Sequence, residues 1–202
     1  LFNVADCKKV GTHFMHFGHL GRGSISKGDK VKVEIDTERR QSITCNHSAT
    51  HLLHEALRLV LGDHVEQRGS MVDGDRFRFD FSHDTSVSAE EIRKVEDIVN
   101  MEIMRNKKVV TTSMSMEEAQ KKGARALFGE KYGDVVRVVN IGEDFSVELC
   151  GGTHVNRSGE IGLVKVALET SVASGIRRIE SCSGAKATES VSYTHLRAHE
   201  TK

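Results

Sequence analysis

Two pairs of strong metal ligands, about a hundred residues apart, constrain the fold of this chain more than any other feature. His47 and His51 stand four positions apart in one segment, and Cys150 and His154 stand four positions apart in another. Three imidazoles and one thiolate form a complete tetrahedral set for Zn²⁺. If all four bind one ion, the fold must bring two distant segments together at a single point.

The first pair fits one face of a helix. Side chains three and four positions apart share a helix face, so His47, Thr50, His51 and His54 form one polar stripe beside an apolar, core-facing arc. Spacing alone leaves two interpretations open, a metal site or partly exposed histidines without a ligand. Spacing also leaves His54 open as a ligand.

The second pair follows a predicted strand. Gly151 and Gly152 come directly after Cys150, and glycine lets the backbone approach a bound molecule closely. We expect their amides to face a substrate. The alternative is a tight turn that only carries His154 round to the metal.

Composition agrees with an intracellular protein of ordinary core size. The chain has 202 residues, and its four cysteines show no disulfide-like spacing, which favours a reducing compartment such as the cytoplasm. No apolar run is as long as a membrane span, so we expect no membrane partner. Formal net charge is zero, without the basic excess usual in nucleic-acid binders.

Periodicity and turn residues predict an α+β fold, an antiparallel sheet with helices packed on one face. A Ser-x-x-Glu capping box at Ser88 begins one helix, and Gly62 ends another. Residues 1–40 look like short strands with glycine-rich turns. The predicted helices span about 43–61, 88–105 and 116–122, and the predicted strands span about 31–36, 65–72, 76–81, 109–113, 135–141, 146–149, 161–169 and 176–182.

Four segments carry a specific resemblance to a known family. Residues 46–54 (NHSATHLLH), 67–70 (QRGS), 148–154 (ELCGGTH) and 174–180 (SGIRRIE) closely resemble the editing domain of alanyl-tRNA synthetase, in the family's order and at compatible spacing. The resemblance covers about residues 1–187. The editing region of threonyl-tRNA synthetase and free-standing alanyl-tRNA editing proteins belong to the same superfamily.

The resemblance implies three parts. Residues 1–40 would be the C-terminal part of a truncated β-barrel whose first strands are missing, and residues 41–187 the zinc-containing editing domain. Residues 188–202 fit nothing in the family and are expected to be an unstructured, non-native tail. We therefore exclude His195 and His199 from the metal site, although they repeat the four-residue spacing.

The resemblance also implies a function. The chain would hydrolyse the ester that joins serine or glycine to mischarged alanine tRNA, with Zn²⁺ held by His47, His51, Cys150 and His154. Its partners would be the acceptor end of tRNA(Ala) and the remainder of the synthetase, where ATP binds. A free-standing deacylase acting in trans and a non-catalytic, zinc-stabilised tRNA-binding module are the alternatives.

An editing pocket needs polar groups that pair with the serine hydroxyl and stay unpaired when alanine enters. By family position, Thr50 and Gln67 suit that role, as catalytic and substrate-binding residues, and Ser70 is a weaker candidate. Thr50 could instead bond back to its helix, and Gln67 could be a solvated strand residue. Arg177 and Arg178 are expected to point to opposite faces of a strand, one toward a tRNA phosphate and the other toward solvent. Arg178 is the candidate for the tRNA contact, and a plain solvated face is the alternative.

Overall fold

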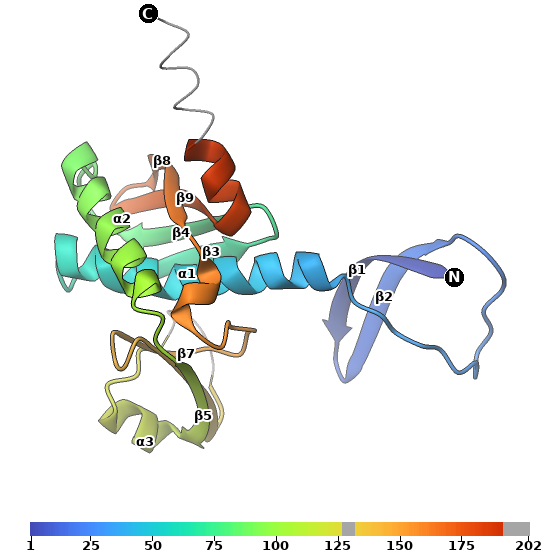
Figure 1. Cartoon of the computed structure of the whole chain (residues 1–202). Coiled ribbons are helices and arrows are strands. Elements are labelled where there is room, and N and C mark those ends of the chain that lie inside the picture. The colour runs from blue at the N-terminus through green and yellow to red at the C-terminus, as the bar shows by residue number, and fades with distance from the viewer. Residues whose placement is uncertain (127–131, 192–202) are drawn as a thin grey trace, which may run out of the picture. The chain divides into compact units, whose positions relative to one another are not determined.

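The computed structural model describes residues 1–126 and 132–191 (Figure 1). The chain forms two compact units, residues 1–35 and a second unit that begins at Asp36. Within the described ranges, no helix is long and apolar enough to cross a membrane. The elements are β1 (Phe2–Val10), β2 (His13–Leu20), α1 (Thr37–Leu61), β3 (Gln67–Val72), β4 (Phe77–Ser82), α2 (Ala89–Met104), β5 (Val109–Ser115), α3 (Met116–Lys121), β6 (Val135–Ile141), β7 (Ser146–Leu149), the 3-10 turn η1 (Ser158–Ile161), β8 (Val164–Ala173) and β9 (Ile176–Ser183).

The first unit is a single antiparallel hairpin of β1 and β2, followed by irregular chain. All its side chains are exposed. The prediction of a strand over residues 31–36 is wrong, because β1 and β2 pair only with each other among the described strands and leave this segment no ladder to join. That the unit is part of a barrel stays a prediction.

The second unit begins with the helix that carries the first ligand pair. The Asp36 carboxylate caps this helix by accepting a hydrogen bond from the backbone N–H of Arg39 at 2.9 Å, so α1 begins at Thr37, six residues before its predicted start at 43. The unit boundary therefore falls after Ile35 rather than after residue 40. Gly62 ends α1 as predicted, in a positive-φ conformation (+116°), and its N–H donates to the Arg58 carbonyl.

Two antiparallel sheets make up the rest, one in the order β3-β4-β9-β8 and one in the order β5-β6-β7. The α+β class is confirmed, although the strands are divided between two sheets instead of sharing one. The capping box at Ser88 and Glu91 is present at the start of α2. Ile161 belongs to η1 rather than to β8, because Gly162 leaves the extended conformation with φ +77°.

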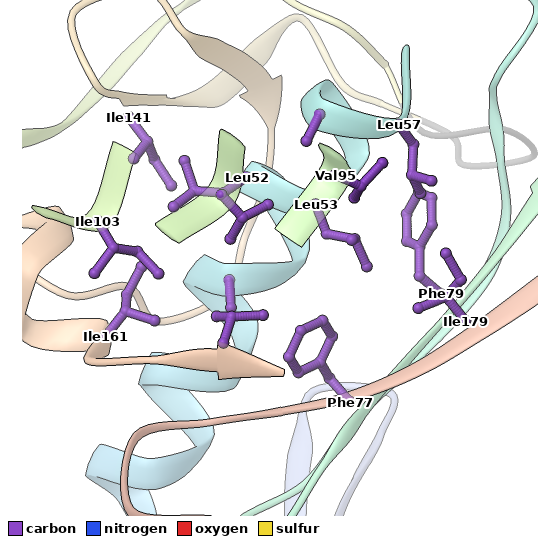
Figure 2. Close-up of a cluster of buried hydrophobic side chains, with 14 of the residues drawn as sticks. Leu52, Leu53, Leu57, Phe77, Phe79, Val95, Ile103, Ile141, Ile161 and Ile179 are labelled. Atoms are coloured by element: carbon purple, nitrogen blue, oxygen red, sulfur yellow. The ribbon is translucent and has the colours of Figure 1, made fainter. Parts of the chain in front are cut away.

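Helices α1 and α2 pack on one face of the four-stranded sheet. Alternation along β4 sends Phe77, Phe79 and Phe81 into this core, while Arg78 and Asp80 point to the opposite face. Figure 2 shows that the cluster collects side chains from α1, α2 and strands of both sheets. The labelled members are Leu52, Leu53, Leu57, Phe77, Phe79, Val95, Ile103, Ile141, Ile161 and Ile179.

A helix over residues 184–191 follows β9 (Figure 1). The prediction of an unstructured tail from residue 188 is therefore wrong for residues 188–191, because Ala187 is fully buried and ties this helix to the unit. The rest of the predicted tail, with His195 and His199, lies outside the described residues.

Two leucines on α1 provide a matched test of this core. Leu53 is fully buried and Leu59 is 60% exposed. We expect Leu53→Ala to lower the free energy of unfolding by ~2–5 kcal/mol because it leaves a cavity. Leu59→Ala should change it by no more than ~0.5 kcal/mol. Urea unfolding followed by circular dichroism measures both, and equal losses would contradict this packing.

Candidate metal centre

The structure brings together the four residues predicted as ligands. One ligand atom from each of His47, His51, Cys150 and His154 lies within 4.8 Å of the others. The Cys150 Sγ atom is 3.4 Å from His47 Nε2 and 3.3 Å from His154 Nε2. The three imidazole centroids are separated by 4.4 to 5.4 Å.

Arg137, on β6, braces the loop that carries the second ligand pair. Its guanidinium donates hydrogen bonds to the carbonyl oxygens of Cys150 at 2.8 Å and Gly152 at 2.5 Å. Its own backbone carbonyl accepts from the Cys150 N–H at 3.0 Å. Sequence analysis missed this residue, because nothing in the strand pattern distinguishes a bracing arginine from a solvated one.

Ser48 fixes the orientation of His154. Its fully buried hydroxyl donates to the Thr44 carbonyl at 3.0 Å and accepts from the Val155 N–H at 3.1 Å. His154 Nδ1 is 3.2 Å away. Because the only hydroxyl proton is already donated to Thr44, Ser48 accepts from an Nδ1–H, and His154 Nε2 then presents its lone pair to the ligand group.

Glu148 orients the ring of His51, as Ser48 orients that of His154. One carboxylate oxygen lies 2.9 Å from His51 Nδ1, and the other lies 2.8 Å from His54 Nδ1. The first contact directs His51 Nε2 toward the ligand group. The second answers the question that spacing left open, because His54 faces Glu148 and is not a member of the group. Glu148 stands two positions before Cys150. Its contacts with His51 and His54 were not predicted, because alternation along a strand indicates only which side chains are buried and which are exposed.

Charges at the site depend on this buried carboxylate. Burial raises the pKa of Glu148, but the adjacent His51 and His54 outweigh it and hold that pKa well below its usual range. Burial lowers the pKa of His51, and the charge of Glu148 overcomes this and raises it to about 10. Burial raises the pKa of the Cys150 thiol, whereas its contacts with the imidazoles of His154, His47 and His51 bring it down to about 3. Without metal, the site therefore holds a thiolate, and a metal that binds His51 must displace a proton.

The residues present fit zinc. A thiolate and three imidazoles are ligands that Zn²⁺ prefers, and the second nitrogens of His51 and His154 already have partners of the kind that hold zinc-bound histidines. His47 differs, because no hydrogen bond in the described part of the chain holds its Nδ1.

Gly152 is required by close packing, and Gly151 is not. A Cβ built on Gly152 would lie 2.1 Å from His47 Cε1, whereas a Cβ on Gly151 would meet nothing within 4 Å. Close packing against His47 therefore requires glycine at position 152, whichever of the two expected roles this residue has. That the amides face a substrate stays a prediction for both.

The other predicted substrate residues lie in different surroundings. Thr50 is buried, and its hydroxyl donates to the Asn46 carbonyl at 2.9 Å, the helix bond expected as its alternative role. Gln67 lies at the start of β3 and shares a cavity wall with His54. Ser70 is nearby, with its Oγ 3.5 Å from Gln67 Nε2. Their roles toward a substrate stay predictions.

Arg177 and Arg178 point to opposite faces of β9, as the alternation predicts. Arg178 binds the Asp80 carboxylate with two hydrogen bonds of 2.7 and 2.8 Å, on the face away from α1. Arg177 donates to Glu169 at 2.6 Å. The structure therefore does not bring Arg178 to the ligand group, and its contact with tRNA stays a prediction.

The two glycines give a sharp test of the metal centre. Gly152→Ala should displace His47 and weaken zinc binding by ~10-fold or more, whereas Gly151→Ala should leave it unchanged. Zinc affinity is measured by competition with a chromophoric chelator. Equal affinities in the two variants would show that His47 is not a ligand in this position.

Glu148→Gln tests the orienting carboxylate. We expect zinc affinity to fall ~10–100-fold, because His51 loses the charged partner that fixes its ring. Glu143→Gln, which removes an exposed carboxylate paired with Lys107, is the matched control. The same chelator competition reports both, and an unchanged affinity in Glu148→Gln would contradict this role.

Comparison with known proteins shows what this chain is similar to. The model of the threonyl and alanyl tRNA synthetase second additional domain matches residues 136–180. The alanine–tRNA ligases of Pseudomonas fluorescens and Saccharophagus degradans are each 55% identical over 186 residues, which is 92% of this chain and 21% of each ligase. That of Dichelobacter nodosus is 55% identical over 184 residues, 91% of this chain and 21% of the ligase.

The chain thus spans about a fifth of the length of the curated relatives it matches. Residues 136–180 include most of β6, all of β7 and the Cys150–His154 loop, and the longer match extends over nearly all the described residues. The resemblance seen in the sequence is confirmed, because this chain is similar to one region of the alanine–tRNA ligases and its residues 136–180 match the second additional domain of threonyl and alanyl tRNA synthetases.

Proposed function

We propose that this chain is an editing domain that hydrolyses the aminoacyl ester of alanine tRNA mischarged with serine or glycine. The convergence of His47, His51, Cys150 and His154 carries the proposal, because it gives the chain a centre for ester hydrolysis. Bound zinc would supply a Lewis acid for the ester carbonyl and lower the pKa of water toward ~7.

There is a physical reason for a hydrolytic site in addition to the synthetic pocket. A synthetic pocket sized for alanine rejects glycine poorly, since one methyl group is worth only ~1–3 kcal/mol, and a pocket of this kind also discriminates weakly against an added hydroxyl. Hydrolysis after the ester has formed removes the errors that binding admits. The likeness to alanine–tRNA ligases supports tRNA(Ala) as the substrate.

The chain's own residues supply binding and orientation. Arg137 holds the Cys150–Gly152 loop, and Ser48 and Glu148 hold the imidazoles of His154 and His51. Thr50 donates its only proton to Asn46, so its free lone pairs can accept a hydrogen bond from the hydroxyl of a seryl ester. Alanine offers no such donor.

Four protein ligands close a tetrahedral sphere, whereas catalytic zinc sites usually keep three. We infer that His47 is the exchangeable member of the group. The second nitrogens of His51 and His154 are held by Glu148 and Ser48, and among the described residues nothing holds His47 in this way. Exchange of His47 would leave space for substrate beside Cys150.

Deacylation of purified tRNA tests the proposal. The zinc-loaded chain should release serine from seryl-tRNA(Ala) at least ~10-fold faster than alanine from alanyl-tRNA(Ala), because only serine pairs with the polar groups of the pocket. Cys150→Ser should lose both zinc and activity. Zinc binding without serine release above buffer would leave only the non-catalytic module. Equal release of both amino acids would contradict the assigned selectivity.

A further inference from the structure

A pair of histidines lies outside the ligand group, where two connecting segments of the second unit meet. His64 lies between α1 and β3, and His83 directly follows β4. The His64 Nε2 atom is 2.8 Å from the His83 Nδ1 atom, and the two rings stack with their centroids 5.1 Å apart. The proposed hydrolysis does not use this histidine pair.

Backbone contacts hold both members of the histidine pair in place. The Ser82 hydroxyl donates to the His64 carbonyl at 2.7 Å, and the Ser82 N–H donates to the Glu66 carbonyl at 3.0 Å. The His83 N–H donates to the Gly175 carbonyl at 3.0 Å. Because the backbone is already fixed, the two side chains lose little freedom when they bind a common ligand.

The separation of the two nitrogens is close to that of two ligands on one metal ion. Metal-bound imidazole nitrogens lie ~2.0–2.1 Å from the ion, so two of them at an angle between ~90° and ~109° are ~2.9–3.4 Å apart. The 2.8 Å between His64 Nε2 and His83 Nδ1 is only slightly shorter. Small rotations of the two rings would therefore let an ion take the place of the proton between them.

Thr85 fits the role of a partner that orients a metal-bound histidine. Its Oγ1 lies 3.2 Å from His83 Nε2. When Nε2–H donates to this oxygen, Nδ1 carries a lone pair that is directed at His64. Metal-bound histidines almost always donate their other ring N–H to an oxygen. In the metal-free pair the shared proton then belongs to His64 Nε2, and a metal that binds there displaces it.

The charges near the histidine pair favour a cation. The exposed Asp84 directly follows His83. Hydrogen bonds with Ser88 lower the pKa of Glu91, and the charge of His83 adds to this effect, so a second carboxylate lies within electrostatic reach. Imidazole nitrogens suit copper, nickel and zinc ions, whereas Mg²⁺ prefers oxygen ligands. The pair therefore suits a transition metal.

We propose that His64 and His83 bind a divalent transition-metal ion of the copper, nickel and zinc group through His64 Nε2 and His83 Nδ1. This site is separate from the ligand group, which includes neither residue. Its metal would join the segment between α1 and β3 to the end of β4. Affinity should be highest for Cu²⁺ and lower for Ni²⁺ and Zn²⁺.

Nickel titration of the zinc-loaded chain tests the proposal. The titrated protein carries His195→Gln and His199→Gln, which remove another histidine pair at a spacing that suits metal binding. We expect calorimetry to show one equivalent of Ni²⁺ in addition to the zinc, and no binding of Mg²⁺. His64→Gln and His83→Gln should each weaken Ni²⁺ binding ~10-fold or more with the zinc content unchanged, because each removes one of two protein ligands.

His13→Gln, at an exposed histidine of the first unit, is the matched control and should bind Ni²⁺ as the parent does. Equal Ni²⁺ affinity in the parent, His64→Gln and His83→Gln would overturn the proposal. So would the absence of any Ni²⁺ binding, or nickel uptake that is matched by loss of zinc from the ligand group. Mg²⁺ binding as tight as that of Ni²⁺ would place the ion on carboxylates and overturn it as well.

A second variant keeps the test decisive if the histidine variants fail to fold. Thr85 is exposed, and Thr85→Val removes the oxygen beside His83 while both ring nitrogens stay. We expect Ni²⁺ binding to weaken ~3-fold or more, because the outer partner of a metal-bound histidine contributes to affinity. Thr112→Val, at an exposed position of β5, is the matched control. Equal Ni²⁺ affinity in the two threonine variants would overturn the proposal.

Discussion

The packing of one face of α1 against the loop after β7 is the contact on which the rest of this structure depends. Ser48 makes it with a single hydroxyl that bonds to its own helix, to the Val155 backbone and to His154. Because the hydroxyl is fully buried, leaving any of these hydrogen bonds unmade would destabilise the fold. Together the bonds fix the position of the loop relative to the helix. The imidazoles and the thiolate meet because that position is fixed.

Glu148 shows how a fully buried charge can be tolerated in such a site. A carboxylate away from water is costly unless it is paired and hydrogen-bonded. Here each oxygen has its own imidazole partner, His51 or His54, and Ser146 adds a longer contact at 3.4 Å. The same carboxylate thus orients a residue of the ligand group on one side and a residue of the neighbouring cavity on the other.

The sequence was sufficient for the class of the fold, most of the helices and strands and all four members of the ligand group. Those features depend on local periodicity, capping residues such as Ser88, and motif spacing. It was not sufficient for Glu148, Ser48 or Arg137, whose roles exist only through contacts with residues about 13 to 106 positions away. The strand expected at residues 31–36 failed for a related reason, since alternation describes one strand and says nothing of a partner to pair with it.

A metal ion bound by both α1 and the Cys150–His154 loop would join two parts of the fold. The loop continues from β7 in the three-stranded sheet, while α1 packs on the four-stranded sheet, so an ion shared by the two pairs is a cross-link between the two sheets. It would close a ring of about a hundred residues, for which the loss of chain entropy in the unfolded state is ~4–5 kcal/mol by the disulfide analogy. One metal ion would then add to the stability that the shared core already gives this unit.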